Sequence, residues 1–147
     1  MKINEKDMFK GLMHLVATQN GAFTKSDSEM GGVKYRVFNY RIPSWTQMQL
    51  PYAQESRGVM FDVTDEENPR LVCLTPKKFF NYKEGQPKEH EKHKLGVKMV
   101  KVDGSLISSF EHKGKVFFKS KNSINSTQVK DSLELLYKDA KLSEEAM

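Results

Sequence analysis

A lysine followed by an Asp-Gly pair stands in the second half of this chain of 147 residues, within the segment Lys101-Val102-Asp103-Gly104-Ser105. A lysine amine attacks as a nucleophile only when it is deprotonated, and a neighbouring cation such as Lys98 or a dry pocket favours that state. Gly104 would let the backbone approach a nucleotide closely. Asp103 could orient the amine or a ribose hydroxyl. Taken alone, such a pentapeptide is more often a surface lysine before an ordinary Asp-Gly turn.

The composition narrows the classes of partner. The net charge of +5 suits a polyanion such as a nucleotide or a nucleic acid, although an ordinary basic surface would give the same value. The single cysteine, Cys73, lies in an apolar run, which predicts a core thiol and excludes an internal disulfide or a multi-cysteine zinc site. No apolar run approaches the roughly 20 residues of a membrane span, and residues 1–10 lack the apolar region of a secretory signal. We therefore expect a cytoplasmic protein with no membrane partner.

Helical periodicity appears near both ends of the chain. Asn4 can cap a first helix that has Asp7 in its first turn, and apolar residues between Met8 and Val16 then fall on one face. This helix should end near Asn20-Gly21. A last helix should begin at Ser126.

Strand-like runs fill the interval between the two helices. Runs rich in β-branched and aromatic residues, or alternating in polarity, predict strands over residues 33–40, 58–63, 70–74, 97–100, 106–111 and 115–119. The polar, glycine-bearing segment 24–32 is expected to be a loop, and the last two strands are expected to form a hairpin through residues 112–114. Lys101 would then stand in a tight connection between two strands. The pattern predicts an α+β domain with antiparallel sheets and flanking helices, and its lack of strand–helix–strand alternation disfavours a doubly wound parallel sheet.

The Lys101 segment resembles the Lys-x-Asp-Gly motif of the covalent nucleotidyltransferases, which include RNA ligases, DNA ligases and mRNA capping enzymes. Four other segments resemble motifs of the phage-type ATP-dependent RNA ligases that repair broken tRNA anticodon loops. These segments are Tyr35-Arg36-Val37-Phe38-Asn39-Tyr40, Glu55-Ser56-Arg57-Gly58-Val59-Met60-Phe61, Pro76-Lys77-Lys78-Phe79-Phe80-Asn81 and Phe118-Lys119-Ser120-Lys121-Asn122-Ser123-Ile124. All five follow the family's order with similar spacing and cover nearly the whole chain. The resemblance implies that residues 1–147 are the N-terminal part of the ligase adenylyltransferase domain.

The resemblance also implies a reaction. The amine of Lys101 would attack the α-phosphorus of ATP and release pyrophosphate, which leaves a lysyl-AMP intermediate. AMP would pass to the 5′-phosphate of an RNA, and a 3′-hydroxyl would displace it and join the ends. Mg²⁺ is expected with ATP because the reacting phosphates concentrate negative charge. The expected partner is RNA, specifically tRNA with a broken anticodon loop, in the cytoplasm of a phage-infected host cell.

The same resemblance assigns nucleotide-binding residues. They are Tyr40, Arg57, Lys78, Asp103, Gly104 and Lys121, and no metal ligand is assigned. An arginine offers a planar donor fork to phosphate or ribose oxygens, and lysines stabilise leaving pyrophosphate as compact charges. The alternatives are an ion pair of Arg57 with Glu55 or Asp62, and solvated surface charges for the lysines.

The chain departs from the family pattern in two places. Asn122 replaces a usual glycine, a mild change because asparagine tolerates positive φ. The family's later glutamate and lysine motifs and its C-terminal domain cannot be placed after Ser126. We therefore expect a fragment, a natural truncation or one half of a split enzyme that a separate chain completes, and weak or absent adenylylation by this chain alone. The alternatives are a nucleotide- or RNA-binding remnant without turnover, and an ordinary α+β domain that carries the motifs by chance.

Two further groups of residues are weaker candidates. Glu89, His90, Glu91 and His93 could bind a metal, but a solvated loop is the more common use of such a charged run. Phe79, Phe80 and Tyr82 could stack on bases, yet core packing is the default expectation for them.

Overall fold

The computed structural model describes residues 2–81, 84, 94 and 96–139. Its elements, in chain order, are α1 (Glu5–Thr18), β1 (Phe23–Met30), β2 (Val33–Tyr40), α2 (Trp45–Met48), β3 (Arg57–Asp62), β4 (Arg70–Cys73), β5 (Ser108–His112), β6 (Lys115–Lys119) and α3 (Thr127–Lys138). The predicted α+β class with antiparallel sheets is confirmed. Over these described residues, no helix combines the length and the apolar character that crossing a membrane requires.

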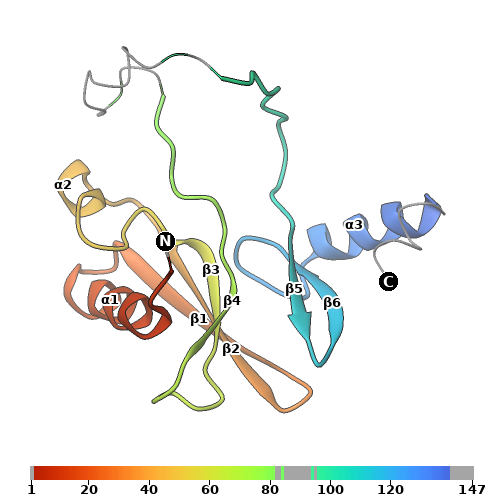
Figure 1. Ribbon diagram of the computed structural model, residues 1–147, viewed down its shortest axis with the longest axis horizontal. Coiled ribbons are helices and arrows are strands. Elements are labelled where there is room, and N and C mark those ends of the chain that lie inside the picture. The colour runs from red at the N-terminus through yellow and green to blue at the C-terminus, as the bar shows by residue number, and fades with distance from the viewer. Residues whose placement is uncertain (1, 82–83, 85–93, 95, 140–147) are drawn as a thin grey trace.

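The strands form two antiparallel sheets. One is a four-stranded meander in the order β1-β2-β3-β4, and the other is the hairpin β5-β6. Figure 1 shows α1 on one side of the meander and the hairpin on the other. The central strand β2 is therefore buried on both faces, with residues 35–39 all buried.

The face of the meander toward α1 carries an aromatic core. Phe9 of α1 meets Phe38 of β2 and Phe61 of β3 edge to face, with ring centroids 5.8 and 5.4 Å apart. Leu12 of α1 and Val59 of β3 belong to the same cluster and are fully buried. Asn4 starts α1 as predicted, since its side chain accepts a hydrogen bond from the backbone of Asp7.

The opposite face of the meander packs against the hairpin. Tyr35 and Val37 of β2 and Cys73 of β4 bury against Phe110 of β5. The hydroxyl of Tyr35 is hydrogen-bonded to Nδ1 of His112. Burial raises the pKa of the Cys73 thiol, as expected of a core cysteine.

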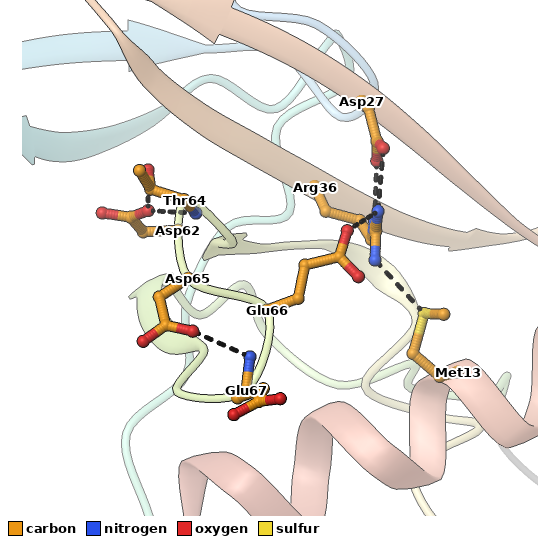
Figure 2. A network of polar contacts seen from close by, with 8 residues as sticks. All are labelled: Met13, Asp27, Arg36, Asp62, Thr64, Asp65, Glu66 and Glu67. Carbon is orange, nitrogen blue, oxygen red and sulfur yellow. Dashed lines mark hydrogen bonds and ion pairs between the residues drawn. The ribbon is translucent and has the colours of Figure 1, made fainter.

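A buried arginine ties four parts of the fold together on the α1 face (Figure 2). Arg36 of β2 donates to both carboxylate oxygens of Asp27 on β1, at 2.7 and 2.9 Å. It also donates to Glu66 in the β3–β4 turn at 3.0 Å and to the sulfur of Met13 in α1 at 3.7 Å. The Arg36 guanidinium lowers the pKa of Asp27. The paired, buried Arg36 therefore links the edge strand β1 and the β3–β4 turn to β2.

Two expectations about secondary structure are wrong. The segment expected as a loop forms β1, which pairs with β2 along its whole length from Phe23–Tyr40 to Met30–Val33 without a bulge. Its polar residues face solvent at a sheet edge, so the polar composition of the segment gave no indication of a strand. The strand expected over residues 97–100 is absent, and Val97 and Val100 are each 90% exposed. The other predicted strands and both helices are confirmed, with ends that shift by up to two residues.

Candidate active site

A cleft of about 450 Å³ opens where β3 begins, β6 ends and α3 begins. It is lined by Arg57, Pro76, Gly104, Ser105, Leu106, Ser120, Lys121, Asn122, Ser123, Ser126 and Gln128. Three of the predicted nucleotide-binding residues, Arg57, Gly104 and Lys121, therefore lie around one hollow although they are far apart in the sequence.

A tight junction between β3 and β6 brings Arg57 and Lys121 to the same cleft. Gly58 follows Arg57, has a φ of +92° and has no partner in the β2–β3 register, which shifts there. A Cβ on Gly58 would lie 2.8 Å from the backbone oxygen of Lys121. Only glycine fits this approach, because the backbones are nearly in contact and φ is positive.

Lys119 fastens this junction from inside. Its side chain is fully buried, and Nζ donates to the carbonyl oxygens of Gly58 at 2.7 Å and Ser120 at 2.8 Å. Burial lowers the pKa of the Lys119 amine. The amine thus joins the residue after Arg57 to the residue before Lys121, and it fixes the spacing of these two cations.

Asn39 of β2 supports the same junction. Its side-chain nitrogen donates to the Lys121 carbonyl oxygen at 3.3 Å and to the side-chain oxygen of Asn122 at 2.7 Å. Asn122 does not have a positive φ in this structure. The asparagine that replaces the usual glycine is therefore accommodated by a side-chain hydrogen bond and not by a left-handed backbone.

The segment after β4 is anchored beside the cleft by hydrogen bonds to the start of β3. Arg57 donates to the Lys77 carbonyl oxygen at 2.9 Å, and the Thr75 hydroxyl donates to the Arg57 carbonyl oxygen at 2.7 Å. The backbone N–H of Lys78 donates to the Gln54 carbonyl oxygen at 2.8 Å. These contacts carry Lys78 and its neighbours to the rim of the site.

Cations and aromatic rings alternate along this rim. The amine of Lys121 lies 4.9 Å from the ring centre of Tyr40, and the amine of Lys78 lies 5.5 Å from the same ring. Lys78 also lies 5.2 Å from the ring of Phe80, and the Arg57 guanidinium lies 5.4 Å from the ring of Phe79. Tyr40 and Lys78 thus lie next to Lys121, and Phe79 lies next to Arg57.

These cations lack carboxylate partners within the part of the chain that the structure describes. Arg57, Lys78 and Lys121 take part in none of the ion pairs found there. Glu55, one suggested partner of Arg57, pairs with Lys77 at 3.1 Å instead. The Nε of Arg57 is buried and has no hydrogen-bond partner among the described residues. The site therefore concentrates positive charge and keeps a donor unused.

Lys101 lies outside the lining of the cleft. Residues 96–107 form no strand pairing and extend away from the two sheets (Figure 1), and Lys101 and Asp103 are exposed. The Asp103 carboxylate accepts a hydrogen bond from the backbone of Gly104 at 3.1 Å. Gly104 and Ser105 are the nearest residues of the motif that line the cleft. The structure thus brings Tyr40, Arg57, Lys78, Gly104 and Lys121 together and leaves Lys101 and Asp103 on the adjoining segment.

The sequence reasoning missed Lys119, Asn39 and Gly58 as positioning residues. A signal existed for Lys119, because strand alternation puts position 119 on the same inward face as Phe117. Nothing local marked Asn39, whose partners lie more than 80 residues away.

The weaker candidates fare differently. The Glu89–His93 cluster and Tyr82 lie outside the described residues, and the described ranges contain no group of metal-ligating side chains. The core expected for Phe79 is wrong, because that side chain is 61% exposed. Phe80 is half-buried and packs edge to face on Trp45 at 5.2 Å.

The chain matches a known protein family. The family described as RNA ligase matches residues 55–146, which is more than half of the chain. The matched range contains Arg57, the Lys77–Asn81 segment, the Lys101 motif and Lys121, and it begins after Tyr40.

Proposed function

The chain belongs to the RNA ligase family, and from that membership we propose that it is an ATP-dependent RNA ligase that forms a lysyl-AMP intermediate at Lys101. The observation that carries the proposal is the convergence of Arg57, Lys78 and Lys121, without carboxylate partners in the described structure, on one cleft and its aromatic rim.

Like charges held this close repel one another, so the arrangement is most favourable when an anion is bound between them. A polyphosphate supplies that anion. The Arg57 fork suits two phosphate or ribose oxygens, and its unused Nε–H leaves a donor for a ligand. Lys78 and Lys121 act as compact charges toward the departing pyrophosphate. Tyr40 offers its ring beside them.

The proposed first step is a displacement at phosphorus. The lone pair of Lys101 Nζ forms a bond to the α-phosphorus, the bond from that phosphorus to pyrophosphate breaks, and the amine loses a proton to solvent. In the second step an oxygen of an RNA 5′-phosphate takes the adenylyl group and frees Lys101. In the third step an RNA 3′-hydroxyl attacks the activated 5′-phosphate and AMP leaves.

Lys101 reaches the cleft through a short movement in this proposal. Two residues separate Lys101 from Gly104, which is in the lining, so three steps along the backbone, about 10 Å, plus the side chain are available. Gly104 has a φ of +137°, which only glycine adopts easily, and it is the natural pivot.

Mg²⁺ is proposed only as an ion that arrives on the nucleotide. Among the described residues, the lining of the cleft offers hydroxyl and amide oxygens but no carboxylate. Proteins usually bind Mg²⁺ through one or two carboxylates together with substrate phosphates. The donors of this lining therefore do not fit a magnesium site that the protein would hold without the nucleotide. By the resemblance of its motifs, the RNA we propose is a tRNA broken in its anticodon loop.

A second candidate is a nucleotide- or RNA-binding domain without turnover. The exposure of Lys101 outside the cleft lining favours it. The two candidates share the cationic cleft and differ only in whether the amine attacks.

The test is transfer of label from ATP carrying radioactive phosphorus at the α position. Label that is stable to alkali and labile to acid is expected on the wild type, at a low level, and not on Lys101→Ala. Lys115→Ala is the matched control, because Lys115 is an exposed lysine at the end of β6 that lies away from the cleft, and this variant should keep the label.

ATP binding, measured by calorimetry on the same proteins, separates the candidates. Binding without label in any variant supports the second candidate and excludes the first for this chain. Absence of ATP binding to the wild type would refute the first candidate and leave only the RNA-binding form of the second. Arg57→Ala and Lys121→Ala are expected to weaken ATP binding.

A further inference from the structure

The row of cations and rings at the rim continues beyond the cleft to an exposed tryptophan. Trp45 packs on Phe80 with ring centres 5.2 Å apart, and Phe80 lies 5.2 Å from the amine of Lys78. Lys78 lies 5.5 Å from the Tyr40 ring, which Lys121 approaches to 4.9 Å. The order is therefore ring, ring, cation, ring, cation, from the surface to the cleft.

Trp45 is held in place by hydrogen bonds at the start of the short helix α2. Ser44 and Gln47 form a capping box around α2, with hydrogen bonds of 3.2 Å from the Gln47 backbone to the Ser44 hydroxyl and 2.9 Å in the reverse sense. The Gln47 side chain also donates to the side-chain oxygen of Gln19 at 3.3 Å, which ties α2 to the end of α1. Trp45 is the first residue of this short helix and is 47% exposed.

A half-exposed indole is here joined through Phe80 to cations that have no carboxylate partner among the described residues, and nucleic-acid-binding proteins use such a combination. Proteins that bind single-stranded nucleic acid combine aromatic faces, on which bases stack, with cations that follow the phosphates. A duplex does not offer its base faces for stacking, so the surface suits unpaired nucleotides. The rings of Phe80 and Tyr40 and the amine of Lys78 separate Trp45 from Lys121, in steps of about 5 Å. A strand with a phosphate at Lys121 can follow this row of cations and rings as far as Trp45.

We propose that Trp45 is an outer base-stacking site for a single-stranded RNA segment whose phosphates run along Lys78 toward Lys121 and the cleft. The proposal rests on the proposed function, since it gives the RNA of that reaction a path to the site. It assigns Trp45 to the RNA strand and not to the adenine of ATP.

Trp45 is the only tryptophan of the chain, so its fluorescence reports on this surface directly. The probe is a 5′-phosphorylated single-stranded RNA of roughly 10 nucleotides, within the length range of single-strand sites. Titration of this RNA into the wild type is expected to quench the Trp45 emission in a saturable way. ATP alone and a blunt duplex of the same sequence are expected to leave the emission nearly unchanged.

Affinity is measured in parallel by anisotropy of the same RNA labelled at its 3′ end. Trp45→Leu is expected to bind about 5- to 150-fold more weakly, which corresponds to the ~1–3 kcal/mol of one stacked base. Trp45→Phe keeps a ring and should recover most of the affinity. Ile42→Ala is the matched control, because Ile42 is 91% exposed in the neighbouring loop and carries no ring.

The outcomes separate this proposal from the proposed function. Equal RNA affinity for wild type and Trp45→Leu, with no quenching, would overturn the stacking site, and intact ATP binding would leave the ligase proposal standing. Quenching by ATP together with loss of ATP binding in Trp45→Leu would assign the ring to the nucleotide and also overturn it. If the wild type binds neither RNA nor ATP, both proposals fail.

Discussion

Replacing Lys119 with methionine tests whether this buried amine joins the two halves of the site. Methionine has nearly the same length and volume, so the substitution removes the hydrogen-bond donor without leaving a large cavity. Two carbonyl oxygens lose their donor, the buried one of Gly58 and the half-buried one of Ser120.

An unsatisfied buried acceptor costs about 1–3 kcal/mol, and the cost is smaller where water can enter. Gly58 should therefore contribute the larger part and Ser120 the smaller, for a total loss of about 2–4 kcal/mol in the free energy of unfolding. For a chain of this length the midpoint of thermal unfolding should fall by roughly 5–15 °C.

The assay is denaturant unfolding followed by circular dichroism and by the fluorescence of Trp45. Lys115→Met is the matched control, because Lys115 is an exposed lysine at the other end of the same strand, and its effect should stay within about 0.5 kcal/mol. ATP affinity of Lys119→Met should fall as well, since Arg57 and Lys121 lose their fixed spacing.

The pH dependence gives an independent check. Burial lowers the pKa of Lys119 from its ordinary 10.5, so the folded protein releases this proton at a lower pH than the unfolded chain does. Between the two pKa values the unfolded state binds more protons, and the free energy of unfolding due to Lys119 rises with pH. Lys119→Met should lack that rise. A variant as stable as wild type at pH 7, with the same slope toward pH 10.5, would refute the role assigned to Lys119.

Two other substitutions test the same architecture. Gly58→Ala should destabilise the fold by at least ~2 kcal/mol in the same unfolding assay, because φ is positive and the new Cβ would lie 2.8 Å from the Lys121 oxygen. Gly32→Ala is the control. Gly32 has a φ of +81° and open space around it, so this substitution should show only the smaller cost of the positive φ. Asp27→Asn should cost about 0.5–1 kcal/mol at pH 7, because the carboxylate that pairs with Arg36 is half exposed. The Asp27 pKa is lowered below 3.8 in the folded state, so this contribution is present above pH 3.8 and is lost as the pH falls through the folded value. The stability difference between wild type and Asp27→Asn should shrink in acid, and a constant difference would contradict the assignment.

Local pattern predicted the elements whose side chains meet a neighbour close in sequence. The caps at Asn4 and Ser126 and the hairpin turn at Lys113-Gly114, where both residues have positive φ, are local chemistry and were predictable. The buried run of β2 was predictable because residues 35–39 are apolar or aromatic except for Arg36 and Asn39.

Partner choice across the sheet was not predictable from local pattern. Segment 23–30 has weak strand propensity, yet it pairs fully because β2 offers an edge and Arg36 offers a charge for Asp27. Residues 97–100 have the alternating pattern but no partner strand in the described structure, so they stay extended and exposed.

The motifs picked residues that the fold brings together, but not the residues that support them from inside. Order and spacing were enough to pick Arg57 and Lys121, which lie in one cleft. Lys119 was missed because lysine is among the residues least often fully buried. Its burial depends on the Gly58 carbonyl oxygen at the bulge of β3, which accepts a hydrogen bond from the Lys119 amine. This acceptor comes within reach of the amine only when β3 and β6 pack together.

The separation of β4 and β5 along the chain also orders the folding reaction. These two strands lie together although residues 74–107 separate them, whereas the connections within α1 and the meander are shorter, the longest being residues 41–56. Closing the long segment costs more chain entropy, so we expect the meander to form in the rate-limiting step and the hairpin to dock afterwards. Changes at Lys119 should then accelerate unfolding and leave the refolding rate almost unaltered. The half of the site that holds Arg57 would thus exist before the half that holds Lys121.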